Sequence, residues 1–127
     1  MKTTELMIGD WVISNKRGKN EIVKVVSFDG GINCCWIGAD CFLGLVACED
    51  LSPISLTPEI LEKNGWKHDG IFMDKRIDEN TCFSWPDRLG AVLYRNNYHM
   101  CDCKYVHTLQ HALRLCELDE LADNFKI

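Results

Sequence analysis

Residues Ile22–Gly31 read IVKVVSFDGG, and this stretch decides the fold of the N-terminal part of the chain. The segment from Ile22 to Phe28 is rich in β-branched side chains, which favour a strand. Asp29 and the two glycines that follow it suit the positive φ angles of a tight turn, so the stretch predicts one arm and the turn of a β-hairpin. The return arm is predicted over Ile32–Ile37.

Two further strands flank this hairpin, one over Trp11–Ile13 and one over Phe42–Ala47. Strands that recur about every 8–12 residues are typical of an antiparallel meander that closes into a small barrel. The segment Ile8–Val12, which reads IGDWV, resembles the first strand of Src-homology-3-like and Tudor-like barrels. We therefore expect residues 1–52 to form a β-barrel-like half, a fold that hosts many different functions.

Signals at both ends predict a first helix over Pro58–Asn64. Thr57 is a suitable N-cap, Pro58 suits the first helical position, and Gly65 suits a left-handed residue after the helix. Beyond this helix the chain predicts a second small sheet, with strands over Ile71–Met73, Thr81–Trp85, Ala91–Tyr94 and Tyr98–Cys103.

A second helix is predicted over Tyr105–Glu117 by an amphipathic stripe with helical spacing, formed by Val106, Leu109, Ala112, Leu113 and Cys116. A final helical turn follows, with Asp119 as its expected N-cap and with Leu118, Leu121, Ala122 and Phe125 facing inward. The elements together predict an α+β protein. We expect a small antiparallel β-barrel-like meander, similar to a Src-homology-3 domain, over 1–52, and a helix–sheet–helix half over 53–127, packed as one compact unit.

The composition is that of an ordinary globular protein, with 127 residues, 46% hydrophobic residues and a formal net charge of −5. This balance excludes long disorder, and the net charge argues against a nucleic-acid protein that relies on bulk electrostatics. The first ten residues carry no export signal, so we expect a cytoplasmic protein. The eight cysteines include no C-x-x-C pair, so we expect reduced and mostly buried thiols, with no cofactor.

The second helix carries the residues that we expect to contact a protein partner, which are His107, Gln110, His111 and Arg114. On a helical projection they fall opposite the apolar stripe, so packing against the stripe does not explain their residue types. In the structural alternative, His107 and Gln110 form hydrogen bonds with neighbouring strands.

A metal site is a further alternative, because two histidines four residues apart can chelate an ion together with nearby thiols. Its ligands would be Cys101, Cys103, His107 and His111.

A basic turn offers a nucleic-acid alternative, since cations beside aromatic rings can hold a phosphate backbone. Its residues are Lys16, Arg17, Lys19 and Lys24, with Trp11 and Trp36 expected nearby. The chain has no P-loop and no G-x-G-x-x-G motif, and no cysteine lies in a catalytic signature. We therefore expect a binding protein and not an enzyme.

Two segments carry a resemblance that covers most of the chain. They are Leu51–Trp66, LSPISLTPEILEKNGW, and Lys104–Cys116, KYVHTLQHALRLC. They resemble a group of uncharacterised small proteins from gut Bacteroidetes and their phages and mobile elements, which share PI-x-LT-x-EIL-x-K-x-GF and YVH-x-LQ patterns. The sequence departs from the pattern at Trp66, where phenylalanine is usual, and the pair Cys101 and Cys103 is not part of it. The resemblance implies a bacterial or phage origin and no particular activity, cofactor or catalytic residue.

Overall fold

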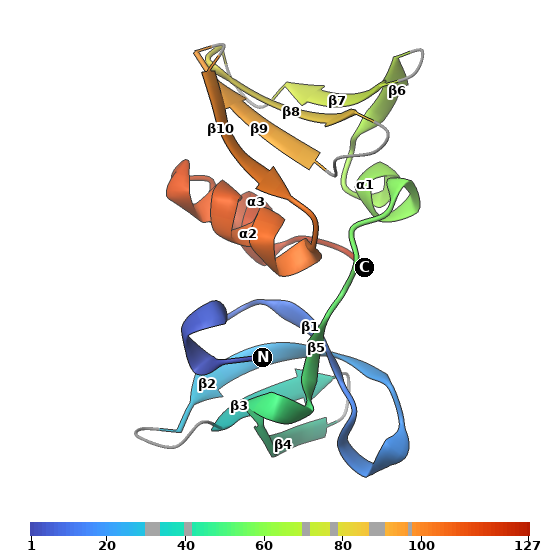
Figure 1. Cartoon of the computed structure of the whole chain (residues 1–127), viewed down its shortest axis with the longest axis vertical. Helices are drawn as coiled ribbons and strands as arrows, with labels where there is room; N and C mark the ends of the chain where they lie inside the picture. The colour runs from blue at the N-terminus through green and yellow to red at the C-terminus, as the bar shows by residue number, and fades with distance from the viewer. Residues whose placement is uncertain (30–33, 40–41, 70–71, 77–78, 87–90, 97) are drawn as a thin grey trace. The chain divides into compact units, whose positions relative to one another are not determined.

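The computed structural model describes residues 1–29, 34–39, 42–69, 72–76, 79–86, 91–96 and 98–127 (Figure 1). The chain is α+β and divides into two compact units, Met1–Ile54 and Ser55–Ile127. Each unit contains one five-stranded antiparallel sheet. The predicted hairpin turn at 30–31 and the start of the predicted return arm at 32–33 lie outside the described residues.

The first unit is built almost entirely from strands. Its sheet has the order β4-β3-β2-β1-β5, with β1 at Trp11–Ser14, β2 at Glu21–Phe28, β3 at Cys34–Ala39, β4 at Phe42–Ala47 and β5 at Leu51–Pro53. Short 3-10 turns accompany the strands in the described part of this unit: η1 at Thr3–Glu5, η2 at Lys16–Gly18 and η3 at Cys48–Asp50. Four of these strands correspond to predicted ones. The fifth, β5, was not predicted, because it has only three residues and ends in a proline.

The expected closure into a barrel does not form, because β4 and β5 remain the two edges of the sheet. The short β5 pairs with β1 over three residues, and those pairs use its whole length. The Lys16 ammonium, next to β1 in sequence, donates a hydrogen bond to the Leu45 carbonyl oxygen of β4 over 2.5 Å. A side chain, and not strand pairing, therefore connects the β1–β2 turn with the β4 edge.

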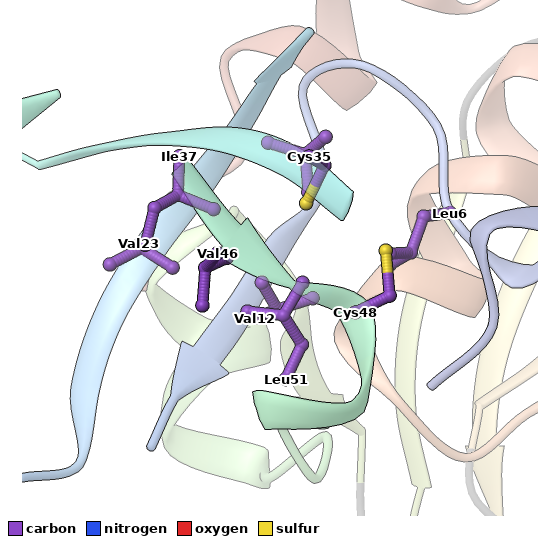
Figure 2. Close-up of a cluster of buried hydrophobic side chains, with 9 residues drawn as sticks. Leu6, Val12, Val23, Cys35, Ile37, Val46, Cys48 and Leu51 are labelled. Carbon is purple, nitrogen blue, oxygen red and sulfur yellow. The ribbon is translucent and has the colours of Figure 1, made fainter. Parts of the chain in front are cut away.

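One face of this sheet carries the core of the first unit (Figure 2). Side chains alternate between the faces of a strand, and in β1 Val12 and Ser14 are buried while Trp11 and Ile13 are half-buried. The core residues have exposures between 0% and 6% and comprise Leu6, Val12, Val23, Val25, Cys35, Ile37, Val46, Cys48 and Leu51. The amino group of Met1 secures the N-terminus beside this core, because it donates hydrogen bonds to the carbonyl oxygens of Cys48 and Leu51.

The second unit combines a sheet of order β10-β9-β8-β7-β6 with three helices. Its elements are α1 at Pro58–Lys63, β6 at Lys67–Asp69, β7 at Phe72–Arg76, β8 at Thr81–Pro86, β9 at Ala91–Arg95, β10 at Tyr98–Cys103, α2 at Val106–Leu115 and α3 at Asp119–Asp123. Strand β6 was not predicted because its sequence, Lys-His-Asp, has no apolar residue. Residue 71, the predicted start of β7, lies outside the described residues.

Local signals explain where the helices begin and end. The Thr57 side chain accepts a hydrogen bond from the Ile60 amide at 3.3 Å, as expected of an N-cap, and Gly65 has a φ of 90° after the helix. Helix α2 is preceded by Tyr105 and ends before Cys116, and Glu117 then adopts a φ of 61°. The expectation that Asp119 caps the last turn is wrong, since Leu118 is the N-cap and Asp119 is the first helical residue.

Aromatic and aliphatic side chains form the core of the second unit. Trp66 meets Phe83 edge to face, with ring centroids 5.9 Å apart. Five aliphatic side chains belong to this core, with Leu56 at 5% exposure and the rest at 0%: Leu61, Val106, Leu109 and Leu113. The helical spacing of the sequence predicted Val106, Leu109 and Leu113 on one buried face of α2.

Candidate functional site

The predicted partner-binding residues of α2 do not form one exposed face. His107 is only 6% exposed and Gln110 is fully buried. The Gln110 side-chain amide donates a 3.0 Å hydrogen bond to the Ala122 carbonyl oxygen of α3. The expectation of a solvent-facing polar side is therefore wrong at these two positions: α3 packs against α2 at Gln110, and the His107 ring is covered from another direction, with Tyr105 stacked on it.

The other polar residues of α2 are also engaged within the second unit. The His107 ring stacks on Tyr105 at 5.9 Å between centroids, and the His111 ring meets His107 edge-on at 5.6 Å. Arg114 forms an ion pair with Asp123 of α3 at 3.4 Å, and its side chain is only 10% exposed. These contacts support a structural role for this side of α2. Gln110 bonds to α3, a contact that the structural alternative drawn from the sequence did not include.

The metal alternative gains no support from the described residues. The Cys103 side chain is buried, and its thiol donates to the Thr108 carbonyl oxygen at 3.8 Å. Cys101 belongs to β10, but its side chain lies outside the described part of the structure. Among the described residues, no group of three or more His, Cys, Asp or Glu side chains is placed to hold a metal ion.

The basic turn brings one predicted lysine to a tryptophan. The Lys24 ammonium lies 5.2 Å from the centroid of the Trp11 ring, within the range of a cation–π contact. Lys16 and Lys19 are exposed, and Lys16 reaches the Leu45 carbonyl oxygen. Arg17 belongs to η2, and its side chain lies outside the described part. The turn therefore supplies cations near the face of the sheet described next.

The face of the first sheet opposite the core carries exposed apolar side chains. We call it the outer face and define it by Trp11, Ile13, Ile22, Lys24, Val26, Trp36 and Leu45. The strand register places these residues side by side, since Trp11 is opposite Lys24, Ile13 is opposite Ile22, and Trp36 is opposite Leu45. Val26 lies at the register shift between β2 and β3, next to the Ser27–Trp36 pair.

The exposure of the outer face is high for residues of this kind. Ile22 is 49% exposed, Val26 44%, Trp36 38% and Leu45 36%. Lys24 is the charged residue within the set. Sequence reasoning did not single out this face, although a signal was present: β2 has apolar residues at both alternating sets of positions, more than a sheet with one buried face needs.

A hollow lined by acidic and apolar side chains lies in the C-terminal part of the second unit. We call it the α3 hollow. It has a volume of about 540 Å³ and is lined by Glu117, Leu118, Asp119, Glu120, Leu121 and Asn124. Leu118 and Leu121 are half-buried in it, whereas Glu117, Asp119 and Glu120 are exposed. The hollow therefore combines apolar walls with carboxylates.

The described cysteines are free thiols, and two of them meet in the core of the first unit. Cys35 and Cys48 are both fully buried. Burial is the largest cause that raises the pKa of Cys35, from 9.0 to about 12. Electrostatic repulsion from the Cys48 side chain and a hydrogen bond with that side chain raise it further. Because a thiolate is the reactive form, Cys35 is inert at neutral pH, which argues against a role in nucleophilic catalysis.

No family model, curated protein or solved structure matches the chain. Among the described residues, no helix has the length and apolar character needed to cross a membrane. The fold and the surfaces thus define a class: an α+β chain with two five-stranded antiparallel sheets, one of which exposes an apolar face.

Proposed function

We propose that the chain is a non-enzymatic binding protein that holds a protein partner on the outer face of its first sheet. The main evidence is that one face of the first sheet carries four apolar side chains, each more than a third exposed: Ile22, Val26, Trp36 and Leu45. Exposed apolar side chains scattered singly are normal on protein surfaces, whereas apolar patches on one face mark interaction sites. The proposed surface thus replaces the polar side of α2, which is largely buried.

The residue types of the outer face support a protein partner. Tryptophan is enriched among the residues that dominate binding energy at protein interfaces. Trp36 is paired with Leu45 on β4, so a rigid aromatic ring and a branched aliphatic side chain lie next to each other. A sheet also holds such side chains in fixed positions, which lowers the entropy cost of binding.

The finer fold assignment belongs to the same proposal. We propose that the first unit is an open relative of the Src-homology-3-like barrels. This assignment is supported by the IGDWV segment, which leads into β1, and by the return of β5 to pair with β1. Such folds host many functions, so the assignment supports a binding module only by analogy. A cytoplasmic, cofactor-free protein of gut Bacteroidetes or their phages remains the setting that we propose.

A capture experiment tests the proposal. The tagged full chain is incubated with nuclease-treated lysate of the organism that encodes it, in parallel with an Ile22→Ser/Trp36→Ser variant. The matched control is Leu115→Ser, which removes an 82% exposed apolar side chain outside the outer face. We expect wild type and control to retain a specific protein that the double variant loses, with unchanged thermal melts.

Two results would overturn this proposal. One is retention of the same proteins by the double variant and the wild type. The other is capture that occurs only in a parallel lysate without nuclease treatment, together with binding of a single-stranded oligonucleotide that Lys24→Ala abolishes. The second result would favour the nucleic-acid alternative, for which the Lys24–Trp11 contact is the specific observation.

A further inference from the structure

We infer that the outer face of one copy of the chain docks onto the α3 hollow of a second copy. This inference rests on the proposed function, because it uses the same outer face and names its occupant. The argument concerns two surfaces with opposite charge, both of which also expose apolar side chains.

The outer face is apolar with positive charge. Lys24 lies within it, between the β1 and β3 residues that are its cross-strand neighbours, Trp11 and Gly38. Lys16, whose ammonium binds the Leu45 carbonyl oxygen, adds a second cation beside β4. None of the residues that define the face is acidic. In a chain with a formal net charge of −5, this face is therefore electrostatically distinct from the average surface.

The α3 hollow has the complementary character. Its walls offer Leu118 and Leu121 as apolar contacts, and its carboxylates are Glu117, Asp119 and Glu120. The lining contains no lysine or arginine. A hollow of about 540 Å³ exceeds the volume of one aromatic side chain, such as that of Trp36.

Charge decides between the two ways in which copies could pair. Contact between two outer faces would bring Lys24 of one copy near Lys24 of the other, and like charges at an interface disfavour association. Contact between the outer face of one copy and the α3 hollow of the other instead brings Lys24 near the carboxylates of the hollow. It also brings the apolar side chains of the outer face near Leu118 and Leu121. The contact is therefore heterologous, with different surfaces contributed by the two copies.

Sedimentation velocity of the full chain tests the inference over two decades of protein concentration. We expect the weight-average sedimentation coefficient of wild type to rise with concentration, and to rise less at high salt because salt screens exposed charges. Lys24→Glu should abolish the rise, because both surfaces are then acidic. Glu120→Lys should reduce the rise as well, because the new lysine repels Lys24 of the approaching outer face and leaves Glu117 and Asp119 as the acidic residues of the hollow.

An equimolar mixture of these two variants provides the decisive arm. The unaltered hollow of Lys24→Glu can then receive the unaltered outer face of Glu120→Lys, so association should return in the mixture, as expected only if the two surfaces come from different copies. The matched controls carry the same charge changes elsewhere. They are Lys104→Glu, whose ammonium also lies over an aromatic ring, and Glu59→Lys, which also lies in the first turn of a short helix. Both should associate as wild type does.

The inference is overturned if wild type sediments as a monomer at every concentration, a result that does not depend on the folding of any variant. It is also overturned if folded Lys24→Glu or Glu120→Lys associates as wild type does, or if their mixture stays monomeric. Monomeric wild type that still captures a separate protein through Ile22 and Trp36 would remove this inference and leave the proposed function standing. Loss of that capture difference would remove the proposed function as well.

Discussion

Replacement of Gln110 distinguishes a structural residue from a binding residue on α2. The side chain is fully buried, and its amide donates a 3.0 Å hydrogen bond to the Ala122 carbonyl oxygen. Gln110→Ala removes this bond, worth about 0.5–1.5 kcal/mol net, and leaves a cavity where a methylene and the amide were. The Ala122 oxygen also accepts bonds from the Asn124 and Phe125 amides, so it is not left unsatisfied. We expect a total loss of about 2–4 kcal/mol.

Urea denaturation followed by far-UV circular dichroism measures this loss. Gln110→Leu keeps most of the volume and removes only the hydrogen bond, so it should cost about 1 kcal/mol. Leu115→Ala, on the exposed side of the same helix, should stay within about 0.5 kcal/mol of wild type. If Gln110→Ala and Leu115→Ala have the same denaturation midpoint as wild type, with the same slope, the packing of α3 on Gln110 is refuted.

Three further predictions concern the core, a helix cap and a buried thiol. Leu109→Ala and Leu113→Ala should each lower the unfolding free energy by about 2–5 kcal/mol, since both side chains are fully buried; unchanged thermal midpoints would contradict the assigned helix face. Thr57→Ala should cost about 1 kcal/mol by chemical denaturation, and Thr57→Ser should restore most of it, because Thr57 accepts the Ile60 amide. The folded-state pKa of Cys35 is raised from 9.0 to about 12, so its protonated form stabilises the fold below pH 9 and that contribution is lost as the pH rises from 9 to 12. Over this window wild type should lose more stability than Cys35→Ala, by up to about 1.4 kcal/mol per pH unit, and parallel stability–pH curves would contradict the raised pKa.

Local signals in the sequence were sufficient for the elements with defined ends. Thr57, Pro58 and Gly65 specify the ends of α1 through contacts within a few residues, and the apolar spacing from Val106 to Leu113 specifies α2. The β-branched residues between Ile22 and Phe28 likewise predicted the strand that the structure shows there as β2. Such features depend on neighbours in the sequence, so they can be read without the fold.

Features that depend on distant contacts could not be predicted in this way. The burial of Gln110 depends on α3, whose position relative to α2 is not encoded in the periodicity of α2. Strand β5 exists because Leu51–Pro53 pairs with β1, far away in the sequence, and the segment has little strand character of its own. The outer face was missed for a related reason, since the register between strands decides that Trp36 and Leu45 are neighbours.

The central claim is that a protein partner binds the outer face, and site-specific photo-crosslinking tests it most directly. The photoreactive amino acid p-benzoylphenylalanine replaces Trp36 in one sample and the exposed Lys63 of α1 in another, and both full chains are irradiated in lysate of the organism that encodes them. We predict a discrete protein adduct from position 36, lost on addition of excess unlabelled wild type and absent from position 63. The absence of any adduct specific to position 36, from a variant that melts as wild type does, would contradict the claim.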